Sequence, residues 1–228
     1  MTLAHEIQTQ GHWQIIVRAT KFIPDRIPYN ELESTLTRAK VSLRGWDFPH
    51  IGESNELRRR LSSVGFETDW NYYREISQFY QSGQFAYLLA IHEDWADRAG
   101  ERWRPPAYFA QRGPLLGVGD TLSRFTEVFA FASKLALTPA GDDEMFIKVE
   151  LRRLTNRMLW VDSPNRSSFD NEYRTDLEIY PMTRVVPRGE LVADYKRIAV
   201  EETANLFKRF GWDASLPLLS EQQNELRW

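Results

Sequence analysis

Residues 70–92 read WNYYREISQFYQSGQFAYLLAIH. Two runs rich in aromatic and β-branched residues, at 70–81 and 84–92, flank the pair Ser82-Gly83. Such runs favour strands, and a two-residue break that contains glycine is typical of a β-hairpin turn. The stretch therefore predicts two antiparallel strands in the middle of the chain.

Other segments predict further strands around this hairpin. Residues 12–22 form an aromatic and β-branched run that stops before Pro24. Residues 145–151 and 157–161 alternate in polarity and predict a second hairpin. Residues 175–186 predict an edge strand, because the Pro181 within them cannot donate to a central ladder. Residues 53–64, by contrast, predict a short polar helix or turn.

Two long segments repeat apolar residues at helical spacing. The first covers about residues 120–137, with Asp120 as a natural N-cap. The second covers about residues 189–210 and ends at Gly211, a typical residue just beyond a helix. Hairpins and two main helices, without regular strand–helix alternation, predict an α+β fold. We expect a mixed or antiparallel sheet packed by these helices.

Length and composition bound the class of protein. The chain has 228 residues, a net charge of −3 and no cysteine. The length predicts a single domain over residues 1–228, with a possible weak subdivision near residues 95–118. The lack of cysteine excludes disulfides, zinc ribbons, iron–sulfur clusters and thiol nucleophiles. The apolar runs are too short to span a bilayer, and no signal peptide is visible, so we expect a cytoplasmic protein without a membrane partner.

Motifs for nucleotide, metal or nucleophile chemistry fail at specific positions. Gly117-Val118-Gly119 precedes a helix, but no third glycine follows, and Asp120 would repel a phosphate. The four histidines form no pair at i, i+4 spacing, and no Gly-x-Ser-x-Gly elbow occurs. We therefore expect no cofactor and no metal site, and no motif identifies a catalytic residue.

The aromatic side chains of the hairpin have the wrong neighbours for nucleic acid. Base-stacking surfaces combine exposed aromatic rings with basic groups, whereas Glu67, Asp69 and Glu75 surround a lone Arg74 here. The slightly acidic chain also lacks a global basic footprint. A nucleic-acid partner is thus disfavoured, and the cluster is expected to form core or protein interface.

The tryptophans divide by context. We expect three of them to lie in strands and in the core: Trp13, Trp70 and Trp160. Three others lie in polar loops, where the pattern does not explain burial: Trp46, Trp95 and Trp103.

Two loops combine aromatic residues or proline with charge, at residues 45–50 and 162–166. Such loops often carry binding residues, although the first could equally pack on itself. The candidate ligand- or partner-binding residues belong to these loops or could converge on them: Arg44, Trp46, Asp47, His50, Glu75, Trp95, Trp103 and Arg166.

Four segments carry a resemblance: RGWDFPH at 44–50, FYQSGQF at 79–85, GVGDT at 117–121 and LWVDSPNR at 159–166. Together they resemble a group of uncharacterised bacterial proteins. Some of these carry such a region beside an AlbA-like, Schlafen-related DNA-binding domain. The resemblance covers about residues 13–212 and implies no activity. It implies a stand-alone version with an accessory or sensing role, since the chain leaves no room for the DNA-binding domain.

The aromatic excess, without a convergent catalytic set, favours a non-enzymatic domain that binds another protein or itself, because tyrosine and tryptophan are enriched at interfaces. One alternative is a small-ligand or nucleotide sensor in which Arg44, Asp47 and His50 supply polar contacts. The other is a hydrolase or nuclease whose site forms only in three dimensions.

Overall fold

The computed structural model describes residues 1–51, 57–70, 73–98, 113–163 and 166–225. Its centre is a seven-stranded sheet in which all neighbouring strands are antiparallel. Across the sheet the strands are β11 (Ile179–Pro187), β9 (Glu144–Arg152), β1 (His12–Ala19), β7 (Phe85–Ala90), β6 (Tyr73–Tyr80), β5 (Ser63–Trp70) and β4 (Arg58–Arg60). The predicted hairpin is confirmed as β6 and β7, and Gly83 in its turn has a φ of 81°.

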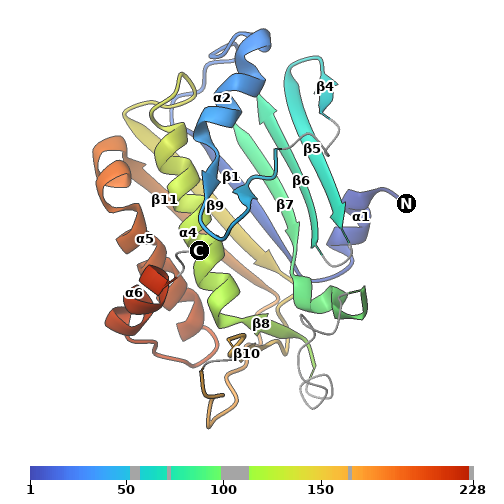
Figure 1. The fold of residues 1–228 in the computed structure, drawn as a ribbon, viewed down its shortest axis with the longest axis vertical. Helices are drawn as coiled ribbons and strands as arrows, with labels where there is room; N and C mark the ends of the chain where they lie inside the picture. The colour runs from blue at the N-terminus through green and yellow to red at the C-terminus, as the bar shows by residue number, and fades with distance from the viewer. Residues whose placement is uncertain (52–56, 71–72, 99–112, 164–165, 226–228) are drawn as a thin grey trace.

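Four helices lie on the same side of this sheet (Figure 1). They are α2 (Leu32–Ala39), α4 (Val118–Leu135), α5 (Arg188–Lys208) and α6 (Leu216–Glu225). The two predicted main helices are confirmed as α4 and α5, and Gly211 just beyond α5 has a φ of 86°. Sheet and helices together make the predicted α+β fold. None of the described helices is long and apolar enough to cross a membrane.

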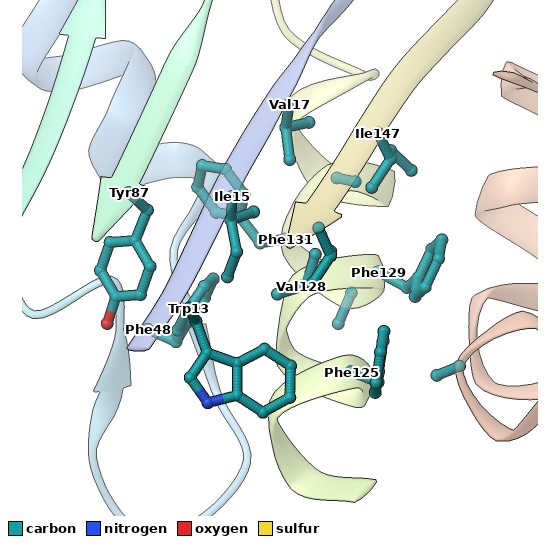
Figure 2. Packing of buried hydrophobic residues seen from close by; sticks show 14 of the residues in the cluster. Trp13, Ile15, Val17, Phe48, Tyr87, Phe125, Val128, Phe129, Phe131 and Ile147 are labelled. Atoms are coloured by element: carbon teal, nitrogen blue, oxygen red, sulfur yellow. The ribbon is translucent and has the colours of Figure 1, made fainter. Parts of the chain in front are cut away.

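Helix α4 is the centre of the core (Figure 2). Of its 18 residues 15 are buried, because it lies between the sheet and α5. The ring of Phe125 packs edge-on against Trp13 of β1, with centroids 5.5 Å apart, and Phe131 contacts Phe85 of β7 at 4.5 Å. Aromatic side chains of the hairpin are thus largely core, as expected.

The prediction for residues 157–161 was wrong in its pairing. This segment forms β10 (Met158–Trp160), which pairs in parallel with β8 (Leu115–Gly117) rather than with the preceding strand. Strand β9 instead pairs with β1 and β11. Its position beside β9 alone makes β11 an edge strand, as Pro181 predicted.

Two more expectations need correction. Residues 58–64 are not helical, because β4 and the start of β5 form a hairpin there; the rest of that prediction, residues 53–56, lies outside the described residues. Trp70 is 45% exposed because it ends β5 at the rim of the sheet, and Trp160 is partly exposed, whereas Trp13 is buried as expected. Most of the suggested subdivision near 95–118 also falls outside the described residues.

Candidate functional site

Residues 44–50 form a tight loop that a short ladder closes. The strand β2 (Val41–Ser42) pairs with β3 (Asp47–Phe48), and Gly45 between them has a φ of 79°, a conformation that glycine adopts without steric cost. Phe48 is buried and packs edge-on against Tyr87 and Phe131. This ring anchors the loop to the sheet and to α4.

Arg44, at the start of the loop, reaches α4. Its Nε and Nη2 donate to the two carboxylate oxygens of Glu127 at 2.9 and 3.0 Å, and its Nη1 donates to Asp120 at 2.6 Å. Bidentate, charge-assisted hydrogen bonds of this kind are the strong ones. The loop is therefore tied to two positions of α4 that lie about two turns apart.

His50, at the end of the loop, meets the sheet. Its Nδ1 lies 3.0 Å from Oε1 of Glu75 on β6, and its backbone amide donates to the same oxygen at 3.2 Å. The hydroxyls of Tyr73 and Tyr87 donate to the other oxygen of Glu75. Thr68 also donates to this carboxylate, at 3.3 Å.

Tyr73 and Arg124 join the two ends. Nη1 of Arg124 donates to the Tyr73 hydroxyl at 3.2 Å and to Glu127 at 3.1 Å, and its Nε lies 3.5 Å from Asp120. A continuous set of contacts thus runs from one end of the loop to the other. We call its members the polar network: Arg44, His50, Tyr73, Glu75, Tyr87, Asp120, Arg124 and Glu127.

The N-terminus of α4 extends this network. The carboxylate of Asp162 accepts the amides of Gly119 and Asp120, both at 2.7 Å. Asp120 was predicted to cap this helix, but α4 begins at Val118, and Asp162 caps it from 42 positions away. Because a carboxylate already fills the anion position at this terminus, the glycines serve the helix cap and not a phosphate loop.

The carboxylate of a second residue, Glu93, also lies close to Gly117. Glu93, in the 3₁₀ segment η2 (His92–Arg98), accepts the Gly117 amide at 2.6 Å and the Trp160 indole at 3.1 Å. A Cβ on Gly117 would lie 2.5 Å from Asp162 and 2.8 Å from Glu93. The glycine is therefore required by this close approach.

Ion pairing holds two buried carboxyls in the charged form. Burial opposes the ionisation of Asp120, but Arg124 and Arg44 outweigh it and keep the pKa of this carboxyl well below its ordinary value. Burial opposes the charge of Glu75 as well, and the hydrogen bond and charge of His50 bring the pKa of Glu75 below its ordinary value.

Two neighbouring groups, His92 and Asp162, have pKa values above their ordinary values. Burial disfavours the His92 cation, but Glu93 and Asp120 outweigh it and raise the pKa of this imidazole to about 9. Burial raises the pKa of Asp162 to about 6, and the amides of Asp120 and Gly119 offset this only in part.

The network leaves little capacity for chemistry. Both oxygens of Glu75 and both of Glu127 accept hydrogen bonds from neighbours, so neither is a free general base. Arg44 directs three of its five N–H donors at two carboxylates. Among the described residues no group of three or more possible ligands could hold a metal ion. The contacts of this network hold the loop 44–50 against β6 and α4.

The structure brings together some candidate residues and separates others. Arg44, His50 and Glu75 converge in the polar network, and Trp46 packs above it, with its ring 5.4 Å from the Arg44 guanidinium and 6.2 Å from His50. Three of the remaining four candidates lie elsewhere, and the fourth is not among the described residues.

Asp47 pairs with Lys40 at 2.5 Å, on the other side of the loop. Arg166 pairs with Glu225 of α6 at 2.5 Å. The ring of Trp95 lies 4.3 Å from the Arg74 guanidinium. Trp103 lies outside the described residues.

Three network members on α4 were not among the candidates. Asp120, Arg124 and Glu127 recur at i, i+4 and i+7, which places them on one face of the helix. Charges at these spacings inside an otherwise apolar helix are the signal that could have identified them, because such groups are buried only when paired.

The side of the sheet that faces away from α2, α4 and α5 forms the second surface of interest, the outer face. Its uncovered centre holds four partly exposed aliphatic side chains on three adjacent strands: Ile16 opposite Ala86, and Ile76 opposite Leu88. They alternate with buried core residues such as Ile15 and Phe79, as expected for a sheet packed on one side.

Part of the outer face is covered. Arg74 points to this side, donates to Glu6 of the short helix α1 (Leu3–Gln8) at 2.8 Å, and lies under Trp95. The short helix α1 contacts β6 and β7, and η2 contacts β6, at this end of the sheet. Among the described residues, the aliphatic side chains at the centre of the face remain partly exposed.

Comparisons with protein-family models, with curated proteins and with solved structures each found no match.

Proposed function

We propose that this chain is a non-enzymatic interaction domain that binds a protein partner through the outer face of its sheet. The observation that carries the proposal is the aliphatic centre formed by Ile16, Ile76, Ala86 and Leu88 on a face that the described helices leave open. Partly exposed aliphatic side chains on neighbouring strands mark interaction surfaces more often than scattered single residues do.

The state of the polar network supports this choice over catalysis. An active site needs groups that are free to exchange protons or contact a substrate, and the carboxylates of Glu75 and Glu127 are fully engaged with neighbours. A buried ionic network adds little net stability compared with apolar packing, but it can impose one specific arrangement. Its role in this proposal is to hold the loop 44–50 in one position.

The wider setting belongs to the same proposal. It includes the accessory or sensing role expected from the sequence resemblance, and a place in the reducing cytoplasm, which the lack of cysteine in the chain suits. The aromatic excess no longer supports an interface, because the hairpin rings of Phe79, Phe85 and Tyr87 are buried.

A charge introduced into the outer face tests the proposal. Leu88→Glu places a carboxylate at the aliphatic centre, and Leu137→Glu makes the same change at a 67% exposed position beyond the end of α4. We expect both variants to fold with the far-ultraviolet circular dichroism of the wild type. Only Leu88→Glu should lose the bound proteins, or the self-association by light scattering, that the wild type shows. If the wild type and both variants retain the same bound proteins and have the same mass by light scattering, the outer face is excluded as the binding surface.

A second candidate is a small-ligand sensor at the loop 44–50, favoured by the Trp46 indole. Its buried Nε1 has no hydrogen-bond partner among the described residues. A ligand acceptor would satisfy this donor, and a ligand at 100 times its Kd would stabilise the fold by about 2.7 kcal/mol. Thermal shift against a nucleotide panel, with Trp46→Phe as the comparison, tests this; equal shifts for both proteins would reject the site.

A further inference from the structure

The outer face differs in charge from the rest of the molecule. Its outward-pointing positions on the seven strands include six basic and four acidic side chains, a net charge of +2 in a chain whose net charge is −3. The basic residues are Arg18, Arg58, Arg60, Arg74, Lys148 and Arg152, and the acidic residues are Glu67, Asp69, Glu144 and Glu150. The rest of the chain is correspondingly acidic in net charge.

The positive charge lies in the part of the face that stays open. Beneath α1, Arg74 donates to Asp69 through hydrogen bonds of 2.8 and 3.1 Å and to Glu6 at 2.8 Å, so this covered end of the face has no excess of positive charge. At the β9 side, Glu150 is shared between Lys148 and Arg152, both at 2.7 Å, which leaves one cation in excess.

The other margins are basic as well. On β4, Arg58 pairs with Glu67 at 2.6 Å, while Arg60 beside it is exposed and adds another positive charge. On β1, the Arg18 guanidinium lies over the Phe146 ring, 4.4 Å from its centroid, and the exposed Glu144 at the start of β9 offsets one of these positive charges. Basic side chains therefore flank the aliphatic centre on both sides.

We propose that the occupant of the outer face is an acidic protein segment whose apolar side chains cover Ile16, Ile76 and Leu88. This inference rests on the proposed function and adds the chemistry of the partner. An apolar centre with a polar, charged rim is the usual anatomy of a protein interface. A partner of opposite charge would associate faster and would be selected over neutral or basic competitors.

Two other occupants fit the face less well. Single-stranded nucleic acid binds sheets through exposed aromatic rings on which bases stack, and the centre here is aliphatic, with Phe146 already covered by Arg18. A second copy of the chain would bring two faces of net positive charge together, and like charges at an interface oppose association.

Peptide selection on the full-length protein tests the inference. The probe is a phage-displayed library of random peptides, selected on the immobilised wild type and counter-selected on Leu88→Glu. We expect enriched peptides to combine net negative charge with several apolar residues, and their affinity to fall as salt rises. Lys148→Glu together with Arg60→Glu should weaken them about tenfold, as rim charges do. Lys208→Glu, at an exposed position of α5, should leave them unchanged.

Each opposing result has a distinct meaning. Enriched peptides that are neutral or basic would overturn the acidic partner while the interaction face survives. If an oligothymidylate binds more tightly than the selected peptides, and Lys148→Glu with Arg60→Glu abolishes this binding, the occupant of the face is nucleic acid and not a protein segment. A homodimer that Leu88→Glu dissociates would replace it by a second copy. If the selection yields no peptide that distinguishes the wild type from Leu88→Glu, the inference is overturned. If Leu88→Glu also retains the same bound proteins and the same mass in solution as the wild type, the proposed function is removed too.

Discussion

Glu127 accepts two parallel hydrogen bonds from Arg44, at 2.9 and 3.0 Å, although the residues are 83 positions apart in the chain. The side chain of Glu127 has no exposed surface and that of Arg44 only 12%, so water could replace little of this pairing if it is broken. The pair makes the position of the loop 44–50 depend on the packing of α4.

Removing one partner of this pair should be costly. We expect Glu127→Met to lower the free energy of unfolding by about 3 kcal/mol, because the buried cations of Arg44 and Arg124 would then share a single carboxylate, that of Asp120. The double variant Arg44→Met with Glu127→Met should lose less than the sum of the two single variants. Urea unfolding of the four proteins measures the coupling; additive losses would mean that the pair does not act as a unit.

The pH dependence of stability should identify His92. Its pKa is about 9 in the folded protein and 6.5 when unperturbed, so the stability that it contributes is complete below pH 6.5 and is lost as the pH rises through 9. The free energy of unfolding of the wild type should exceed that of His92→Gln by a margin that depends on pH. We expect this margin to be larger below pH 6.5 than above pH 9, by up to about 3 kcal/mol. Urea unfolding across the window tests this. His5→Gln, at an exposed position of α1, should follow the wild type, and a constant difference for His92→Gln would contradict the assignment.

Asp162 should make the stability of the protein depend on pH in a more acidic range than His92 does. Its folded pKa of about 6 lies above the ordinary value of 3.8, so its contribution is complete below pH 3.8 and is lost as the pH rises through 6. The free energy of unfolding of the wild type, relative to that of Asp162→Asn, should fall by up to about 3 kcal/mol across this window and remain constant at higher pH. A difference that grows with pH instead would show that the carboxylate is stabilised by the end of α4 beyond its desolvation cost.

Local patterns were sufficient for most elements of the fold. The hairpin of β6 and β7, the helices α4 and α5, and the edge position of β11 follow from periodicity and from single residues such as Gly83 and Pro181. The parallel pair of β8 and β10 does not, because its register depends on segments 43 positions apart that carry no shared local pattern. Residues 58–64 gave a polar pattern that suits a helix turn or an edge hairpin equally.

The candidate site was predictable only in part. Arg44, His50 and Glu75 stood out as charged groups near aromatic residues, and the fold does bring them together. Their partners on α4 lie between the apolar residues whose spacing predicts that helix, and this apolar pattern alone does not show that they are buried. The cap of that helix came from Asp162 rather than from Asp120, since a long-range carboxylate can satisfy amides that a local residue would otherwise satisfy.

Gly117 offers a direct test of that long-range cap. In Gly117→Ala the new methyl group would lie 2.5 Å from Asp162 and 2.8 Å from Glu93, and moving these carboxylates breaks their hydrogen bonds to the backbone of α4 and to Trp160. We expect a loss of about 2 kcal/mol in the free energy of unfolding, in the range for breaking a buried network. The control is Gly189→Ala, in the first turn of α5, where a Cβ meets nothing within 4 Å.

The control should be neutral or more stable by about 0.4–1 kcal/mol, because alanine restricts only the unfolded chain there. Shortening the opposing carboxylate supplies the second half of the test. If contact with Asp162 is the cause, Asp162→Ser should cost less in the Gly117→Ala background than in the wild type, because the clash is relieved as the cap is lost. Equal costs in both backgrounds, measured by urea unfolding, would place the origin of the Gly117→Ala effect elsewhere in the backbone.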